Sequence, residues 1–434
     1  MKPSPLLSAA LLVAAALPAA AQRVDYEDEP HNYFSVELYD ACTKFDLALR
    51  DGKATIELKD EKQMVRDVLK HLNVNLASQV MVFSKSSLQK DLMGPRSPRC
   101  VWFNDETYVG WVPGGLMEFG SVDPRLGPVF YSLNPNRPDR AVPRLDRSES
   151  CMNCHGGSMT NNVPGFMLRS VFPDKDGQML LRAGTSLIDH TTPIKERWGG
   201  WYVTGNHGTM KHMGNSFAAP GADGNVILNT EGSFNLKSLG KFFDTKPYLR
   251  ADSDIVALMV MEHQVAMQSR LTEAAYDLRS AIVRQKGLRE ELEEPPTDEF
   301  FGSTKVVADS HMEKVLKCLL FVGEALMPDG GVDGGMEFQE AFRANKQAAP
   351  DGKSLKDLQL LTHIFKHRCS YQIYTAQWDA LPVKFLEQTY RRLYDILTAA
   401  ETVKGYGHLS AGERKEILEI LRATKPGLPA YWKS

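Results

Sequence analysis

The sequence has little net charge and no long apolar run beyond its first residues. Its 51 lysines and arginines nearly balance 54 aspartates and glutamates, which leaves a formal net charge of −3. Such a balance gives no electrostatic reason to expect a nucleic acid or an anionic membrane as partner. The most apolar internal stretch, Ile255–Met261, is followed at once by Glu262 and His263. We therefore expect no transmembrane helix in the mature chain and no nucleic-acid partner.

The first 21 residues have the composition of an export signal. Lys2 gives a short positive start, Leu6–Leu17 is almost entirely apolar, and Ala19–Ala21 fits the small-residue cleavage rule. The apolar part is too short to span a bilayer. We predict a signal peptide over residues 1–21 and a periplasmic or secreted mature protein. An uncleaved membrane anchor is the alternative.

Cysteine is scarce, and only one C-x-x-C pair is present among the six cysteines, so no second pair completes a zinc site. That pair, Cys151 and Cys154, is followed directly by His155. C-x-x-C-H is the pattern of c-type haem attachment. The two thiols bond to the haem vinyl groups, and the histidine supplies the proximal iron ligand. We predict one covalent haem c; a structural disulfide or a reactive dithiol is the alternative.

Four cysteines remain: Cys42, Cys100, Cys318 and Cys369. An even number in an exported chain is compatible with up to two disulfides. The pairing we expect is Cys42 with Cys100 and Cys318 with Cys369, because each pair falls within one predicted region. Buried free thiols are the alternative.

The sixth position of the iron decides whether it only exchanges electrons or also binds a small ligand. Residues 198–215 hold two histidines, two methionines and two tryptophans among five glycines. Glycines let a backbone approach a flat macrocycle closely. Within this stretch we rank His212 and Met213 first as distal ligand and His207 next. His263, on a predicted helix beside Glu262, is the remaining alternative.

Other histidines have weaker context. His190 follows Asp189, which can orient its ring, but we expect a structural role. His363 and His367 stand four apart on a predicted helix and could face one metal. No third ligand is evident for them, so we interpret that face as solvated.

The pattern of apolar residues predicts an α+β fold with a mostly helical C-terminal part and a loop-rich haem region in the middle. Its regions are 22–110 (mixed α/β), 111–250 (cytochrome c-like haem-binding) and 251–434 (helical). The expected helices are 59–72, 254–284 with Ser253 as cap, 302–326, 353–367, 383–401 and 411–423. The expected strands are 79–83, 100–112 and 129–133, with a hairpin of 165–172 and 178–183 around the turn at 173–177.

Several stretches resemble one exported bacterial family, whose members are generally described only as cytochrome c domain-containing proteins. They are Val80–Lys85, Trp102–Asp105 with Tyr108–Gly115, Cys151–Gly157, Trp198–Gly205 and Arg368–Tyr371. The resemblance covers most of the mature chain. It implies covalent haem at Cys151 and Cys154, iron ligation by His155, and electron transfer.

We therefore expect a monohaem electron carrier that works with a redox partner protein or a small-molecule electron donor or acceptor. The chain is longer than a carrier needs, so a haem-dependent oxidoreductase with an open distal site, peroxidase-like or small-ligand processing, is the alternative. Its acid–base candidates are Asp189, His190, His207 and Glu262. A redox or gas sensor is a third class. The spin state of the iron separates the first two.

Overall fold

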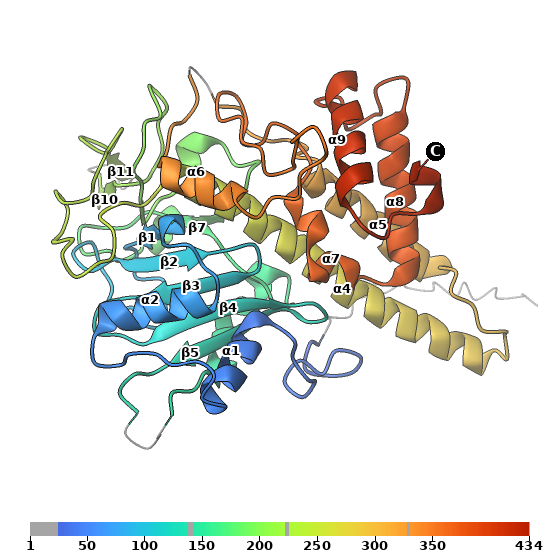
Figure 1. Ribbon diagram of the computed structural model, residues 1–434, viewed down its shortest axis with the longest axis horizontal. Helices are drawn as coiled ribbons and strands as arrows, with labels where there is room; N and C mark the ends of the chain where they lie inside the picture. Colours follow the sequence, from blue (N-terminus) through green and yellow to red (C-terminus); the bar gives the residue numbers. More distant parts are fainter. Residues whose placement is uncertain (1–24, 138–141, 222–224, 328–329, 434) are drawn as a thin grey trace, which may run out of the picture.

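The computed structural model describes residues 25–137, 142–221, 225–327 and 330–433 (Figure 1). It joins one seven-stranded sheet to a largely helical C-terminal part, which confirms the predicted α+β class. The predicted signal peptide, residues 1–21, lies outside the described residues.

The sheet has the strand order β6-β5-β4-β3-β2-β1-β9, and every neighbouring pair is antiparallel. Its strands are β1 (Val80–Val82), β2 (Arg99–Phe103), β3 (Thr107–Trp111), β4 (Met117–Asp123), β5 (Gly127–Leu133), β6 (Asp146–Arg147) and β9 (Trp201–Tyr202). The three predicted strand regions are confirmed, whereas β4 was missed. Because β4, β5, β6 and β9 lie beyond residue 110, the predicted N-terminal and haem-binding regions share one sheet.

Alternating side chains give the sheet two separate cores. One face packs on α1 (Ala41–Arg50) and α2 (Glu61–His71) through residues such as Trp102 and Trp111. The other face, which includes Val101, packs on the long helix α4. Helices α1 and α2 begin where aspartate side chains, of Asp40 and Asp60, accept two backbone N–H groups each.

Helix α4 (Ile255–Glu291) runs past the sheet and out toward the C-terminal helices (Figure 1). The predicted helix is confirmed, but its cap is Asp254, whose carboxylate accepts the N–H of Ala257 at 2.8 Å. Ser253, the predicted cap, bonds the sheet instead: its hydroxyl donates to the carbonyl of Tyr202 at 2.6 Å. The start of α4 is thereby fixed against the strands.

The remaining helices largely follow the prediction. They are α5 (Gly302–Leu319), α6 (Met336–Arg343), α7 (Ala376–Asp379), α8 (Val383–Thr398) and α9 (Ala411–Thr424). The predicted helix at 353–367 is wrong, because that segment forms turns joined by isolated β-bridges. The side-chain oxygen of Gln359 accepts three nearby backbone N–H groups, and such local bonds compete with a helix. His363 and His367 therefore share no helix face.

Two smaller sheets complete the described fold. Strand β7 (Arg169–Val171) pairs with β8 (Thr185–Leu187), and β10 (Phe217–Pro220) pairs with β11 (Val226–Asn229). The predicted hairpin is confirmed only around its turn, where Pro173 and Met179 form an isolated antiparallel bridge and Asp174 accepts two N–H groups. Residues 178–183 form no strand, and the strand that pairs with β7 is β8. The predicted disulfides are also absent: Cys42, Cys100, Cys318 and Cys369 are free, buried thiols.

Candidate functional site

A cavity of about 220 Å³ lies between the sheet and α4, and the C-x-x-C-H motif forms part of its wall. Strands β2 to β5, residues 166–169 and Trp201 supply much of the lining. Met261 and Val265, one turn apart on α4, face it from the helix side. The motif thus borders a part of the sheet's α4 face that side chains leave incompletely filled.

Both cysteines of the motif reach this cavity because the chain winds into a short helix there. Glu149–Cys151 forms a 3₁₀ turn and continues as α3 (Met152–His155). Residues three apart on such a turn lie on the same side, and Cys151 and Cys154 both line the cavity. Cys154 is exposed and Cys151 half-buried. Burial raises the pKa of the Cys151 thiol.

Two contacts hold the ring of His155 in one orientation. Its Nδ1 lies 2.8 Å from the carbonyl oxygen of Gly165, so Nδ1–H donates and Nε2 keeps its lone pair. The ring also stacks on Phe130, with centroids 4.2 Å apart. Burial lowers the pKa of the imidazole and favours its neutral form. Metal-binding histidines commonly have such a bond at the second nitrogen.

The floor of the cavity depends on two glycines inside strands. Gly110 in β3 and Gly120 in β4 both line it. A Cβ atom on Gly120 would meet the ring of Phe166 at 2.5 Å, and one on Gly110 would meet the guanidinium of Arg99. Without these glycines, Phe166 and Arg99 would be pushed away from the sheet and into the cavity.

Polar groups in the wall are paired. Arg99 Nε lies 2.8 Å from Glu118 Oε2 in a partly exposed ion pair. The hydroxyl of Tyr108 donates to Gln268 at 2.8 Å and accepts from Gln264 at 2.7 Å. Burial raises the pKa of Tyr108, which therefore stays protonated. The rest of the lining is mainly apolar and aromatic.

This donor set fits a covalent haem c. Cys151 and Cys154 offer two free thiols one turn apart, and His155 offers Nε2 with its other nitrogen already engaged. Phe130 and Phe166 give the apolar, aromatic surroundings that a macrocycle needs.

The structure places the predicted distal candidates outside the cavity lining. His207 and His212 form a buried pair, with their Nε2 atoms 3.2 Å apart, and the N–H of Asn235 donates to His207 Nε2 at 3.0 Å. The hydroxyl of Ser170 lies 3.6 Å from the sulfur of Met213. None of the three ligand candidates lines the cavity. The glycine-rich loop thus reaches the cavity through Trp201 but not through its predicted ligands.

Two methionines that do line the cavity were missed in the sequence. Met167 lies 12 residues after His155, and Met261 belongs to the apolar run that opens α4. The available signal was the spacing of Met261 and Val265, which places both on one side of a helix. Arg99 and Glu118 were missed as well, because they meet only through the pairing of β2, β3 and β4.

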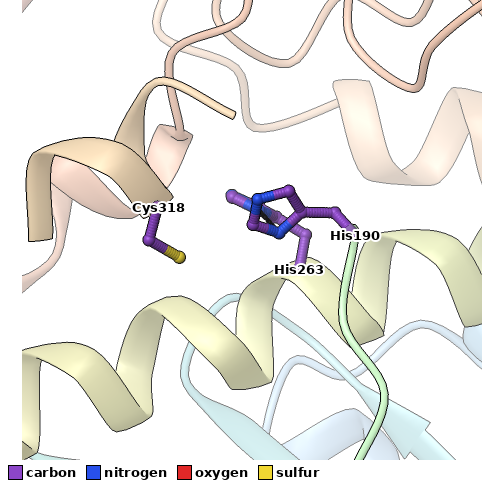
Figure 2. A group of neighbouring side chains, drawn as sticks. All are labelled: His190, His263 and Cys318. Carbon is purple, nitrogen blue, oxygen red and sulfur yellow. Dashed lines mark hydrogen bonds between the residues drawn. The ribbon is translucent and has the colours of Figure 1, made fainter. Parts of the chain in front are cut away.

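His263 takes part in a different cluster. Its Nδ1 lies 3.3 Å from Nδ1 of His190, and Cys318 approaches from α5 (Figure 2). One ligand atom from each of these three residues lies within 4.8 Å of the others, and all three are buried. The structure therefore brings together His190 and His263, but not His263 and the haem motif.

Comparison with family models, curated proteins and solved structures gave no match for this chain. Among the residues that the structure describes, no helix has the length and apolar character needed to cross a membrane.

Proposed function

We propose that this chain is an exported monohaem c-type cytochrome. Cys151 and Cys154 would bind the haem covalently, and His155 would be its proximal ligand. The observation that supports this most strongly is that all three side chains line one cavity, with Nδ1 of His155 held by the carbonyl of Gly165. The motif is thus arranged for the chemistry that its sequence indicates.

When bound, the haem supplies an iron centre that accepts and releases an electron. The protein residues position and tune it. Gly165 fixes the tautomer and the direction of His155, while Phe130 and Phe166 exclude water from the wall. The exposed Cys154 lies at the edge of the cavity, where a redox partner protein or a small electron donor or acceptor can approach.

A haem-dependent oxidoreductase is the second candidate, and one observation favours it. Among the described lining residues, His155 is the only histidine, and the thioethers of Met167 and Met261 are the only other soft donors besides the motif cysteines. If neither methionine completes the coordination of the iron, the sixth position is open to a small ligand.

The periplasmic or secreted location, and membership of the cytochrome c domain-containing family, belong to the same proposal. They are supported by the composition of residues 1–21 and by the stretches that resemble that family. Covalent haem attachment in an exported chain is consistent with both.

The test is an optical titration of the mature chain produced with haem-attachment machinery. We expect a low-spin spectrum that is reduced and reoxidised reversibly, and loss of that spectrum in His155→Ala. The control is His71→Ala, an exposed histidine on α2. Met261→Leu and Met167→Leu identify a methionine ligand if either converts the iron to high spin.

Two results would change this view. A wild-type iron that is high-spin and binds cyanide quickly favours the oxidoreductase. A chain that carries no haem under these conditions contradicts both candidates.

A further inference from the structure

A second buried cluster of metal-ligand side chains lies on another side of α4. His263 comes from α4, Cys318 from α5, and His190 from the segment that follows β8 (Figure 2). Their exposed fractions are 0%, 8% and 2%. Three segments far apart in the sequence thus bring two imidazoles and one thiol together in the core.

The surroundings orient these side chains. His263 Nε2 lies 2.7 Å from the hydroxyl of Ser370, which leaves Nδ1 directed at His190. Phe321 stacks on His263, with centroids 3.9 Å apart. A hydrogen bond at the remote nitrogen and a packed ring are the usual supports of a histidine ligand.

One polar atom in the cluster has no partner. Nε2 of His190 is buried and makes no hydrogen bond among the described residues. A buried nitrogen without a hydrogen bond destabilises the folded chain. A ligand bound at this nitrogen would remove that cost.

The local charges also tolerate a cation. Arg197 is paired with Glu262 at 3.1 Å, and Arg270 with Glu273 at 3.0 Å, so both nearby guanidinium groups are balanced. Asp189, beside His190, adds a negative charge.

We propose that His190, His263 and Cys318 bind one copper ion. Closed zinc sites have four protein ligands, and open ones keep a water. Here three buried ligands, two imidazoles and one thiol, are enclosed by aromatic rings. Two histidines with one cysteine in a trigonal set are typical of copper. Binding releases the thiol proton of Cys318 to the solvent, because the thiolate is the form that binds a metal.

The copper site does not depend on the haem proposal. Met261 and His263 lie on the same helix but point to different sites. Met261 lines the cavity beside the C-x-x-C-H motif, whereas His263 belongs to the histidine–cysteine cluster. A copper ion would therefore lie across α4 from the C-x-x-C-H motif.

The test is copper binding by the full mature chain, with Cys151 and Cys154 either bonded to haem or replaced by alanine so that they cannot bind the metal. We expect one copper per chain after dialysis. X-ray absorption at the copper edge, which iron does not disturb, should show one sulfur and two imidazoles. This measurement uses unaltered ligands and so does not depend on any variant folding.

Variants then assign the ligands. Cys318→Ser and His190→Asn should weaken copper binding by more than about 100-fold, since even outer-shell partners contribute about 10–100-fold. Cys42→Ser, a buried free thiol in the other core, is the matched control and should bind copper as the wild type does. Circular dichroism checks that each variant folds. Copper without sulfur ligation, binding unaffected by these variants, or zinc that copper cannot displace would overturn the proposal.

Discussion

The two faces of the central sheet bury very different side chains. The face covered by α1 and α2 is filled mainly by aliphatic and aromatic residues, with Trp102 fully buried. The face covered by α4 also buries the hydrogen-bonded pair of Tyr108 and Gln264, and the ion pair of Arg197 and Glu262. The C-x-x-C-H cavity and the histidine–cysteine cluster both adjoin α4.

The core beneath α1 and α2 contributes mainly to the stability of the fold, whereas the core beneath α4 also holds the side chains of the two candidate sites. Burying a polar or charged group costs free energy unless each atom is paired. The face covered by α1 and α2 buries such groups as well, because Asp40 accepts from the hydroxyl of Tyr131 at 2.6 Å and Asp46 accepts the N–H of Leu145 at 2.8 Å. The two faces differ in that both candidate sites adjoin α4, so perturbing the two faces should have unequal effects on ligand binding.

The largest effect is expected from breaking the buried ion pair. Arg197→Met leaves Glu262 in the core with only the indole N–H of Trp198, which lies 2.6 Å from its other oxygen. Removing one partner of a buried pair typically costs about 3–5 kcal/mol. Urea unfolding measures the loss. The control is Lys305→Met in the exposed pair with Asp309, which should cost about 0–1 kcal/mol. Equal losses at both sites would contradict the difference between the faces.

A pH-dependent effect is expected at the start of α4. Burial raises the pKa of the Asp254 carboxyl from its usual 3.8 to about 6. The folded state therefore holds this proton more tightly. Its stabilising contribution is complete below about pH 4 and is lost as the pH rises through about 6, roughly 3 kcal/mol in all.

Asp254→Asn should remove that dependence. Relative to the wild type, the variant should gain stability between pH 4 and pH 7.5, as measured by urea unfolding at several pH values. Asp60→Asn, at the exposed cap of α2, is the control and should leave the wild-type profile in place. Parallel profiles for wild type and Asp254→Asn would show that the buried cap does not titrate as expected.

A middle-sized effect is expected at the floor of the cavity. Gly120→Val should displace the ring of Phe166, cost about 1–3 kcal/mol and reduce haem incorporation. Gly110→Ala should cost less, because the group that it meets is the flexible end of Arg99. Haem absorbance per chain and thermal unfolding measure the two effects. Full haem loading in Gly120→Val would mean that the floor does not limit the site.

The smallest effect is expected on the face covered by α1 and α2. Asp60 caps α2 by accepting the N–H groups of Lys62 and Gln63 at 2.9 and 3.1 Å. Asp60→Ala should destabilise the chain by about 1 kcal/mol. Haem incorporation should be unchanged, because this helix does not contribute to the cavity lining. A loss of haem in this variant would show that haem incorporation also depends on the face covered by α1 and α2.

The parts of the molecule that local sequence encodes were predictable. The haem motif occupies five consecutive residues, and the long helix α4 follows from its apolar spacing and a polar cap, although the cap is Asp254 rather than Ser253. Segment 353–367 has helical spacing too, but local side-chain bonds of Gln359 override it.

Sites assembled from distant segments were not predictable. Which side of α4 faces the sheet decides that Met261 lines the cavity while His263 meets Cys318, and sequence alone does not set that rotation. The glycine-rich loop contains several residues that could bind the haem iron, but two of them, His207 and His212, pair with each other. Both rings pack against Phe234, and His212 also packs against Trp198.

The most direct test of the account is the intact mass of the denatured mature chain after production with haem-attachment machinery. The account predicts that the chain carries the mass of one haem, that Cys151→Ala with Cys154→Ala abolishes this increase, and that Cys42→Ala with Cys100→Ala preserves it. A wild-type chain without added haem, or a haem adduct that survives loss of Cys151 and Cys154, would contradict the central claim.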